Sequence, residues 1–300
     1  MGWRSVIISQ HAKLSYADNS MIVQTIEGIN TIPIEDIYLL VIQTTQAVIT
    51  TELINNLNKN HAKIIFTDEN HNPACETVEY YPNNRSLDTL ECQHDWPQTR
   101  MELLWTKIVN RKIMNQIQVL KMYNHDTQKL SDELDQLELN DVTNREAVVA
   151  RQYFEQLFGK EFKRRDFSPM NSALNYGYAI LLSNFNREVV IKGYLTYLGI
   201  HHHSEENAFN LSSDLMEPFR PIVDLWLNSK KFNEFTPDIK FGLVELLNIE
   251  IIYNGEVTIL KNAIEKYTDD CLNFLTNGKP TNIEVEFINE VPNNALNDNV

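Results

Sequence analysis

The sequence of 300 residues is 43% hydrophobic and carries a formal net charge of −15. A chain of this length and composition can bury a large core, divided between about two domains. Taken alone, the acidic total argues against a nucleic-acid-binding protein, because neutralising phosphates requires lysine and arginine. The three cysteines are scattered and form no CxxC pair, which fits a reducing cytoplasm and argues against a thiolate zinc site. There is no apolar run of ~18 residues and no secretory signal, so we expect a cytoplasmic protein outside the membrane.

Residues 1–81 are predicted to form a small β-rich domain. Short apolar, β-branched runs up to Phe66 are separated by turn residues. The continuous apolar run at 37–42 predicts a strand buried on both faces. A short helix is expected near 53–57, with Thr50 or Thr51 as its N-cap. A last strand is expected at 77–81.

Residues 82–95 are interpreted as a linker, because the hydrophobic period changes there from two to about 3.6. Residues 96–281 are predicted to form a larger all-α domain, and residues 282–300 an acidic tail. The predicted fold class is therefore α+β. Lys107, Arg111 and Lys112 are assigned to a solvated helix face. Helices are expected at 101–120, 144–158, 172–182, 189–198, 241–252 and 260–274.

Glu146 is the first candidate functional residue. It precedes Val149, Tyr153 and Leu157 by three, seven and eleven positions, so it projects from the same helical stripe as these core residues. A carboxylate taken out of water needs a cation, a metal or strong hydrogen-bond donors. Alternatively, Glu146 lies in the first helical turn and only favours the helix dipole. The residues leave both interpretations open.

A second group of candidates lies between positions 201 and 220. Histidine and carboxylates together are ligand chemistry for a divalent metal, and arginine is suited to a phosphate. Gly199 is expected to end a helix, which places the histidines at a helix end or in the following loop. The structural alternative is a capping box with Asp214 as N-cap and Glu217 as its partner. The group consists of His201, His202, His203, Asp214, Glu217 and Arg220.

Positive charge is concentrated in one short segment. Lys160, Lys163, Arg164 and Arg165 fall within six positions. Such a cluster either contacts the backbone of DNA or forms a solvated surface, and the residues do not distinguish these two interpretations.

Three segments give the chain a specific resemblance. They are NREA at 144–147, LNYGY at 174–178 after Asn171, and LGIHH at 198–202 followed by DLMEPFRP at 214–221. On these segments the chain resembles the CRISPR-associated integrase, the universal enzyme of spacer acquisition. The style of the final octet is similar to the type II branch, which accompanies a single-effector, RNA-guided nuclease. In that family a strand-rich domain precedes an all-helical catalytic domain.

The resemblance implies a metal site of two acidic residues and one histidine. It selects Glu146 and Glu217 as the acidic ligands, and His202, which is three positions after Gly199, as the histidine. Asp214 matches a further acidic position and would support a ligand or replace one. Arg220 would orient the motif or a phosphate, with a buried ion pair as the equal alternative.

The implied reaction is the insertion of short duplex DNA into a repeat array. The 3′-hydroxyls attack phosphodiesters with the help of Mg²⁺ or Mn²⁺. The implied partners are double-stranded DNA, a second copy of the chain, a small dimeric CRISPR-associated protein that bridges two dimers, and further type II adaptation proteins.

Two other functions are weighed against the integrase. One is a metal-dependent endonuclease that cuts branched DNA with the same residues. The other is a non-catalytic helical scaffold, in which Glu146 and Asp214 only cap helices.

Overall fold

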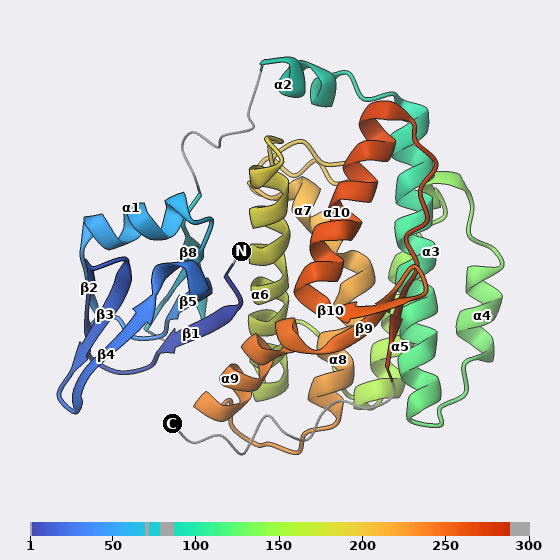
Figure 1. The fold of residues 1–300 in the computed structure, drawn as a ribbon. Helices are drawn as coiled ribbons and strands as arrows, with labels where there is room; N and C mark the ends of the chain where they lie inside the picture. Colours follow the sequence, from blue (N-terminus) through green and yellow to red (C-terminus); the bar gives the residue numbers. More distant parts are fainter. Residues whose placement is uncertain (1, 70–71, 79–86, 289–300) are drawn as a thin grey trace.

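The computed structural model describes residues 2–69, 72–78 and 87–288. The N-terminal region contains two four-stranded sheets (Figure 1). Helix α1, Thr51–Lys59, packs against this region, and the side chain of Thr50 caps it by accepting from the backbone N–H of Leu53. The two sheets confirm the prediction that the chain begins with a β-rich region. One sheet has the order β4 (Gly28–Pro33), β3 (Ser20–Thr25), β2 (Lys13–Ala17), β6 (Val48–Ile49), and the other β1 (Arg4–Ile8), β5 (Ile37–Ile42), β7 (Lys63–Thr67), β8 (Pro73–Glu76).

Strand β5 joins the two halves of the molecule. All six of its residues are buried, and it pairs in parallel with β1 and β7, as the apolar run predicts. Because side chains alternate along a strand, Leu40 and Ile42 enter the N-terminal core while Leu39 and Val41 enter the helical core. This sheet therefore contributes side chains to both hydrophobic cores.

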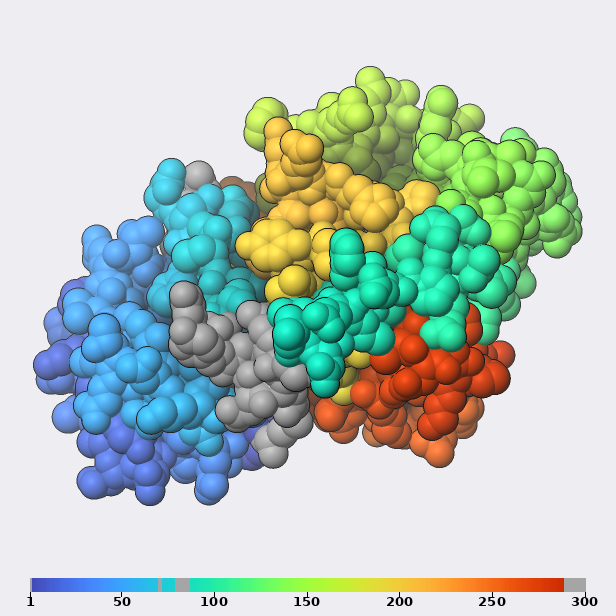
Figure 2. Space-filling view, turned by 90° about the horizontal axis from the view of Figure 1, so that it is seen from above, coloured from blue at the N-terminus to red at the C-terminus, as the bar shows by residue number. Residues whose placement is uncertain are grey.

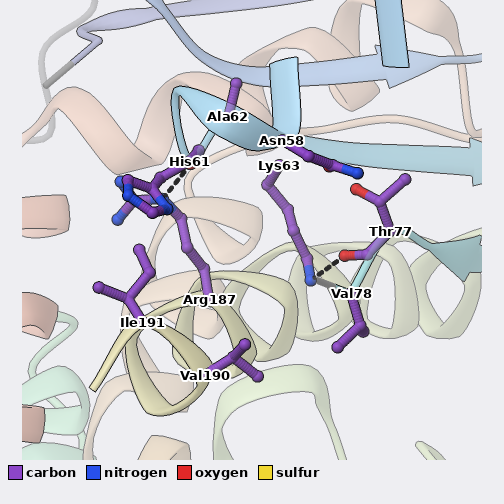
Figure 3. A pocket seen from close by; sticks show the side chains of 9 residues that line it. All are labelled: Asn58, His61, Ala62, Lys63, Thr77, Val78, Arg187, Val190 and Ile191. Carbon is purple, nitrogen blue, oxygen red and sulfur yellow. Dashed lines mark hydrogen bonds between the residues drawn. The ribbon is translucent and has the colours of Figure 1, made fainter. Parts of the chain in front are cut away.

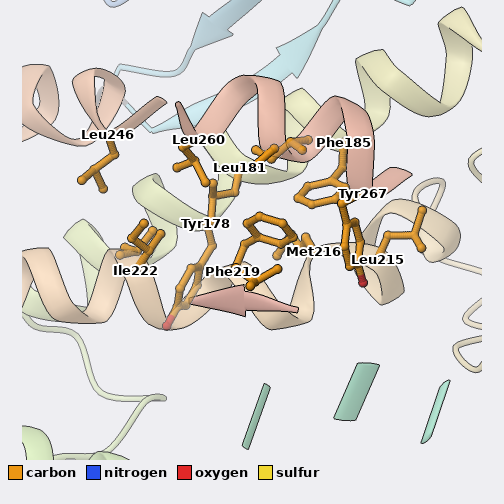
Figure 4. Close-up of a cluster of buried hydrophobic side chains, with 14 of the residues drawn as sticks. Tyr178, Leu181, Phe185, Leu215, Met216, Phe219, Ile222, Leu246, Leu260 and Tyr267 are labelled. Atoms are coloured by element: carbon orange, nitrogen blue, oxygen red, sulfur yellow. The ribbon is translucent and has the colours of Figure 1, made fainter. Parts of the chain in front are cut away.

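The larger part of the chain is mostly helical. Helices α3, α6 and α10 lie side by side at its centre (Figure 1). Aromatic and aliphatic side chains from α6, α7, α8 and α10 interlock in the core between them (Figure 4). The helices are α2 (Leu87–His94), α3 (Gln98–Met122), α4 (Gln128–Leu134), α5 (Arg145–Phe158), α6 (Pro169–Ile191), α7 (Asn210–Met216), α8 (Arg220–Asn228), α9 (Pro237–Glu245) and α10 (Leu260–Asn277), with short 3₁₀ turns at Ile34–Asp36, Leu139–Asp141, Glu217–Phe219 and Leu246–Asn248.

The prediction that this part is entirely α-helical is wrong in one place. A three-stranded sheet is formed by β9 (Glu250–Tyr253), β10 (Glu256–Ile259) and β11 (Val285–Phe287). Asn254 and Gly255 both have positive φ, 50° and 82°, and make the two-residue turn that an Asn-Gly pair favours in a hairpin. The expected helix at 241–252 therefore ends before β9, and residues 285–287 of the predicted tail are paired.

Helix α6 is longer than predicted and uninterrupted. Residues 186–188, which fall between the helices expected at 172–182 and 189–198, are inside it and buried. Asn186 donates to Glu76 at 2.8 Å, and Nε of Arg187 donates to the backbone carbonyl of His61 at 2.7 Å. These contacts attach α6 to strand β8 and to the turn between α1 and β7. The helix expected at 189–198 instead ends at Ile191, and residues 192–209 are a loop.

A small cavity lies at the same junction (Figure 3). It is lined by residues of the α1–β7 connection, the end of β8 and α6, and its volume is about 20 Å³. That volume suits about one water molecule, so this cavity is not a ligand site.

Two further boundaries differ from the prediction. Residues 87–94 of the predicted linker form helix α2. A strand is expected at 77–81, but residues 77 and 78 are not in a strand and follow directly after β8, and residues 79–81 lie outside the described residues. No helix in the described ranges is both long and apolar enough to cross a membrane.

Candidate metal and DNA site

Glu146 is presented at the N-terminus of α5. The carboxylate of Asp141 accepts from the backbone N–H groups of Arg145 at 2.7 Å and Glu146 at 3.0 Å. These two N–H groups of the first turn would otherwise have no partner within the helix. Glu146 thus lies in the first turn, as the dipole interpretation requires. Its side chain nevertheless faces inward and is 19% exposed, as the stripe of core residues predicts.

Lys112 lies between the two acidic candidates. Its Nζ is 2.5 Å from Oε1 of Glu146 and also donates to Oε2 of Glu217. Burial would lower the pKa of this lysine, but the carboxylates of Glu217 and Glu146 outweigh that effect and raise it. The assignment of Lys112 to a solvated face is therefore wrong, since the residue is buried.

Glu217 is buried and has two positive neighbours. Nε of Arg220 lies 3.1 Å from its Oε1, and Lys112 approaches its other oxygen. Burial would raise the pKa of Glu217, but Arg220 and Lys112 hold it below the ordinary value. The guanidinium of Arg220 also lies 4.9 Å from the ring centre of Tyr178. Arg220 therefore forms the ion pair with Glu217, and its side chain is still 33% exposed.

The capping-box interpretation of Asp214 and Glu217 is wrong. Helix α7 begins at Asn210, so Asp214 lies within it, and Glu217 opens the next 3₁₀ turn. Asp214 is fully buried and binds the histidine loop instead. Its carboxylate accepts from the backbone N–H groups of Ile200 at 2.7 Å and His201 at 2.9 Å.

Gly199 allows this loop to approach α7. A Cβ at position 199 would lie 2.3 Å from the carbonyl oxygen of His202 and 2.9 Å from Oδ2 of Asp214. The glycine is therefore required by close backbone approach. It does not end a helix, because residues 192–209 are not helical.

The three histidines have different environments. His201 stacks on buried Trp105, with ring centres 4.3 Å apart, and burial lowers its pKa. His202 engages Asp214 through Nδ1, and this hydrogen bond raises the pKa of His202 against the effect of burial. Nδ1 is occupied, so Nε2 is the ring nitrogen that can take a metal. His203 is exposed, and the loop lies at the surface shown in yellow in Figure 2.

The donor atoms fit a divalent metal. Two carboxylates and one imidazole are ligands for Mg²⁺ or Mn²⁺. In the described ranges, no three His, Cys, Asp or Glu side chains are already close enough to hold an ion. An ammonium group stands between Glu146 and Glu217 instead. The two carboxylates therefore need a positive charge beside them, and a bound divalent ion would supply one.

The basic segment connects α5 and α6 and divides into two parts. Arg164 donates to the side-chain oxygens of Asn171 at 2.6 Å and Asn175 at 2.9 Å, so it holds the start of α6. Lys160, Lys163 and Arg165 are exposed. Arg165 lines a groove of about 800 Å³, which also contains Lys240 and Phe235 and does not include the candidate metal ligands.

Comparison with known proteins places the chain in a family. The family model described as CRISPR associated protein Cas1 matches residues 5–235. The chain belongs to the Cas1 family. It is 34% identical over 273 residues to a CRISPR-associated endonuclease Cas1 of Neisseria meningitidis serogroup C, and the match covers 89% of this chain and 90% of that one.

Solved structures show the same fold. A casposase bound to its integration product matches with a TM-score of 0.77 at 19% identity, over 93% of this chain and 92% of that one. A chain from a partial Cas6-RT-Cas1–Cas2 complex matches with a TM-score of 0.59 at 18% identity, over 97% of this chain and all of that one. These likenesses confirm the β-rich region followed by a mostly helical one.

Lys112 is the site residue that the sequence interpretation missed. It follows Trp105 and Ile108 by seven and four positions, so it occupies the buried stripe of α3. A lysine on such a stripe needs an acidic partner. That spacing is the signal that identifies it.

Proposed function

We propose that this chain is a metal-dependent DNA integrase of CRISPR spacer acquisition, of the type II branch. It joins the 3′-hydroxyl ends of short duplex DNA to phosphodiesters of a repeat array. The observation that carries the proposal is that the carboxylates of Glu146 and Glu217 both contact the ammonium of Lys112, in a chain of the Cas1 family. The fold shared with a casposase bound to its integration product supports joining of DNA strands.

Glu146, Glu217 and Nε2 of His202 would hold Mg²⁺ or Mn²⁺. When bound, the ion polarises the scissile phosphodiester and stabilises the charge that develops on it. Asp214 orients His202 by accepting from both its backbone and its ring. Arg220 lowers the pKa of Glu217, and its partly exposed side chain would offer a positive charge to a phosphate.

The proposed partners are double-stranded DNA, a second copy of this chain and the small dimeric CRISPR-associated protein that bridges two such dimers, with further type II adaptation proteins. The fold is shared with a chain of a Cas6-RT-Cas1–Cas2 complex, and that assembly supports a bridging partner. Lys160, Lys163 and Arg165 are exposed and would contact DNA phosphates. DNA would therefore occupy a restricted basic surface on an acidic protein, which we propose acts in the cytoplasm.

Strand transfer tests the proposal. Protein and bridging partner are mixed with Mn²⁺, a repeat-bearing plasmid and a labelled duplex that ends in either a 3′-hydroxyl or a 3′-deoxy group. We expect label in the plasmid only with the 3′-hydroxyl. Glu146→Gln should reduce joining by about 10²-fold or more, the scale of losing one charge-stabilising group. Glu155→Gln, on the exposed face of α5, is the matched control.

The other outcomes favour the alternatives. Plasmid cutting with both duplexes, without joining, supports the endonuclease that cuts branched DNA. No reaction with folded protein, metal and bound partner supports the non-catalytic scaffold.

A further inference from the structure

Lys112 has an unusual position for a lysine next to a proposed metal site. It extends from the buried stripe of α3 and is 7% exposed. Its ammonium contacts Oε1 of Glu146 and Oε2 of Glu217, which belong to α5 and to the 3₁₀ turn after α7. One amine therefore bridges two carboxylates from separate elements.

The charges explain why a cation has to be present there. Two ionised carboxylates brought together out of water repel each other and lose hydration. Arg220 pairs with Oε1 of Glu217, whereas the Lys112 ammonium contacts both Glu217 and Glu146. Without that ammonium, the two carboxylates would lose the cation that holds them together.

We propose that Lys112 is an internal counter-ion that occupies the metal position in the metal-free protein and withdraws when a divalent ion binds. The inference rests on the proposed metal site. A lysine ammonium and a divalent ion compete for the same carboxylate oxygens, because each satisfies the same negative charge. The four-carbon stem of lysine lets the ammonium move while its backbone stays in α3. Lys112 therefore keeps the site assembled and lowers its affinity for the metal.

Direct metal binding tests the competition without an activity assay. Free Mn²⁺ is measured by electron paramagnetic resonance during titration of the full chain. We expect Lys112→Met to bind Mn²⁺ at least about tenfold more tightly than the wild-type chain, which corresponds to about 1.4 kcal/mol. Without metal, the same variant should melt at a lower temperature, and Mn²⁺ should stabilise it more than the wild type. Lys121→Met, exposed on the same helix, is the control and should change neither value.

Two variants keep the test decisive. Lys112→Arg retains a cation and should not tighten metal binding. Lys112→Gln retains a hydrogen-bond donor, and should bind more tightly than the wild type even if Lys112→Met does not fold.

Failure of the inference and failure of the proposed metal site give different results. If wild-type binding is lost in Glu146→Gln but is unchanged in both neutral Lys112 variants, the metal site stands and the competition is refuted. If the wild type and all variants bind no Mn²⁺, the proposed site and the inference are both refuted.

Discussion

The carboxylate of Asp214 accepts from both the backbone N–H and the ring Nδ1 of His202, twelve positions away in the chain. It accepts from Ile200 and His201 as well, so one buried side chain fixes the histidine loop against α7. His202 can therefore present Nε2 in a defined direction, and Asp214 acts as a positioning residue.

Asp214→Ala should lower the free energy of unfolding by about 3 kcal/mol or more. It leaves several donors of the histidine loop unpaired, and a hydrogen bond to a charged group contributes about 1.5–3 kcal/mol. Denaturant unfolding measures this loss. Glu206→Ala removes an exposed carboxylate from the same loop and should be neutral. Equal effects of the two substitutions would contradict the role given to Asp214.

Asp224 should make stability depend on pH. Burial raises the pKa of this carboxyl from 3.8 to about 6, partly offset by a hydrogen bond from Tyr178. Below pH ~4 the carboxyl is protonated in both the folded and the unfolded protein, and its raised pKa does not lower the free energy of unfolding. Above pH ~6 it is ionised in both, and the full loss of stability is present. The pKa difference of about 2 corresponds to a loss of roughly 3 kcal/mol in the free energy of unfolding.

Asp224→Asn should therefore gain stability relative to the wild type as the pH rises from 4 to 7. Urea unfolding of both proteins across this range measures the difference. A stability difference that does not change with pH would show that Asp224 titrates normally.

The basic segment should separate into a structural and a DNA-binding part. Arg164→Ala should lower the melting temperature, because Asn171 and Asn175 lose their shared donor. Arg165→Ala should leave the melting temperature unchanged and weaken duplex binding. The slope of the logarithm of the binding constant against the logarithm of the salt concentration should become smaller by about 1. Melting curves and binding at several salt concentrations provide the two readouts. The assignment fails if Arg165→Ala unfolds the protein or leaves the slope unaltered.

Local pattern predicted much of the fold. The apolar run at 37–42 forms the buried strand, and the helix over 144–158 places Val149, Tyr153 and Leu157 in the core as expected. The small third sheet was missed although Asn254-Gly255 is a strong hairpin signal. Its strand β11 pairs with β9 from a distance of about thirty positions, and such pairing leaves little local trace.

Polar residues explain the remaining errors. The run at 186–188 resembles a helix break, but its partners Glu76 and His61 come from strand β8 and from the turn between α1 and β7. Lys112 resembles a surface lysine until Glu146 and Glu217 are brought to it by the fold. Asp214 fits a capping pattern locally, whereas its actual partners lie in the preceding loop. In each case the deciding contact is distant in sequence.

A crystal structure with Mn²⁺ would decide whether these residues form a metal site, because the anomalous signal of the ion locates it without assumptions about activity. We expect one peak coordinated by Glu146, Glu217 and Nε2 of His202, with the Lys112 ammonium withdrawn. A peak bound elsewhere, or a fully loaded crystal in which Lys112 still bridges the two carboxylates, would contradict the proposed site and the role of Lys112 within it.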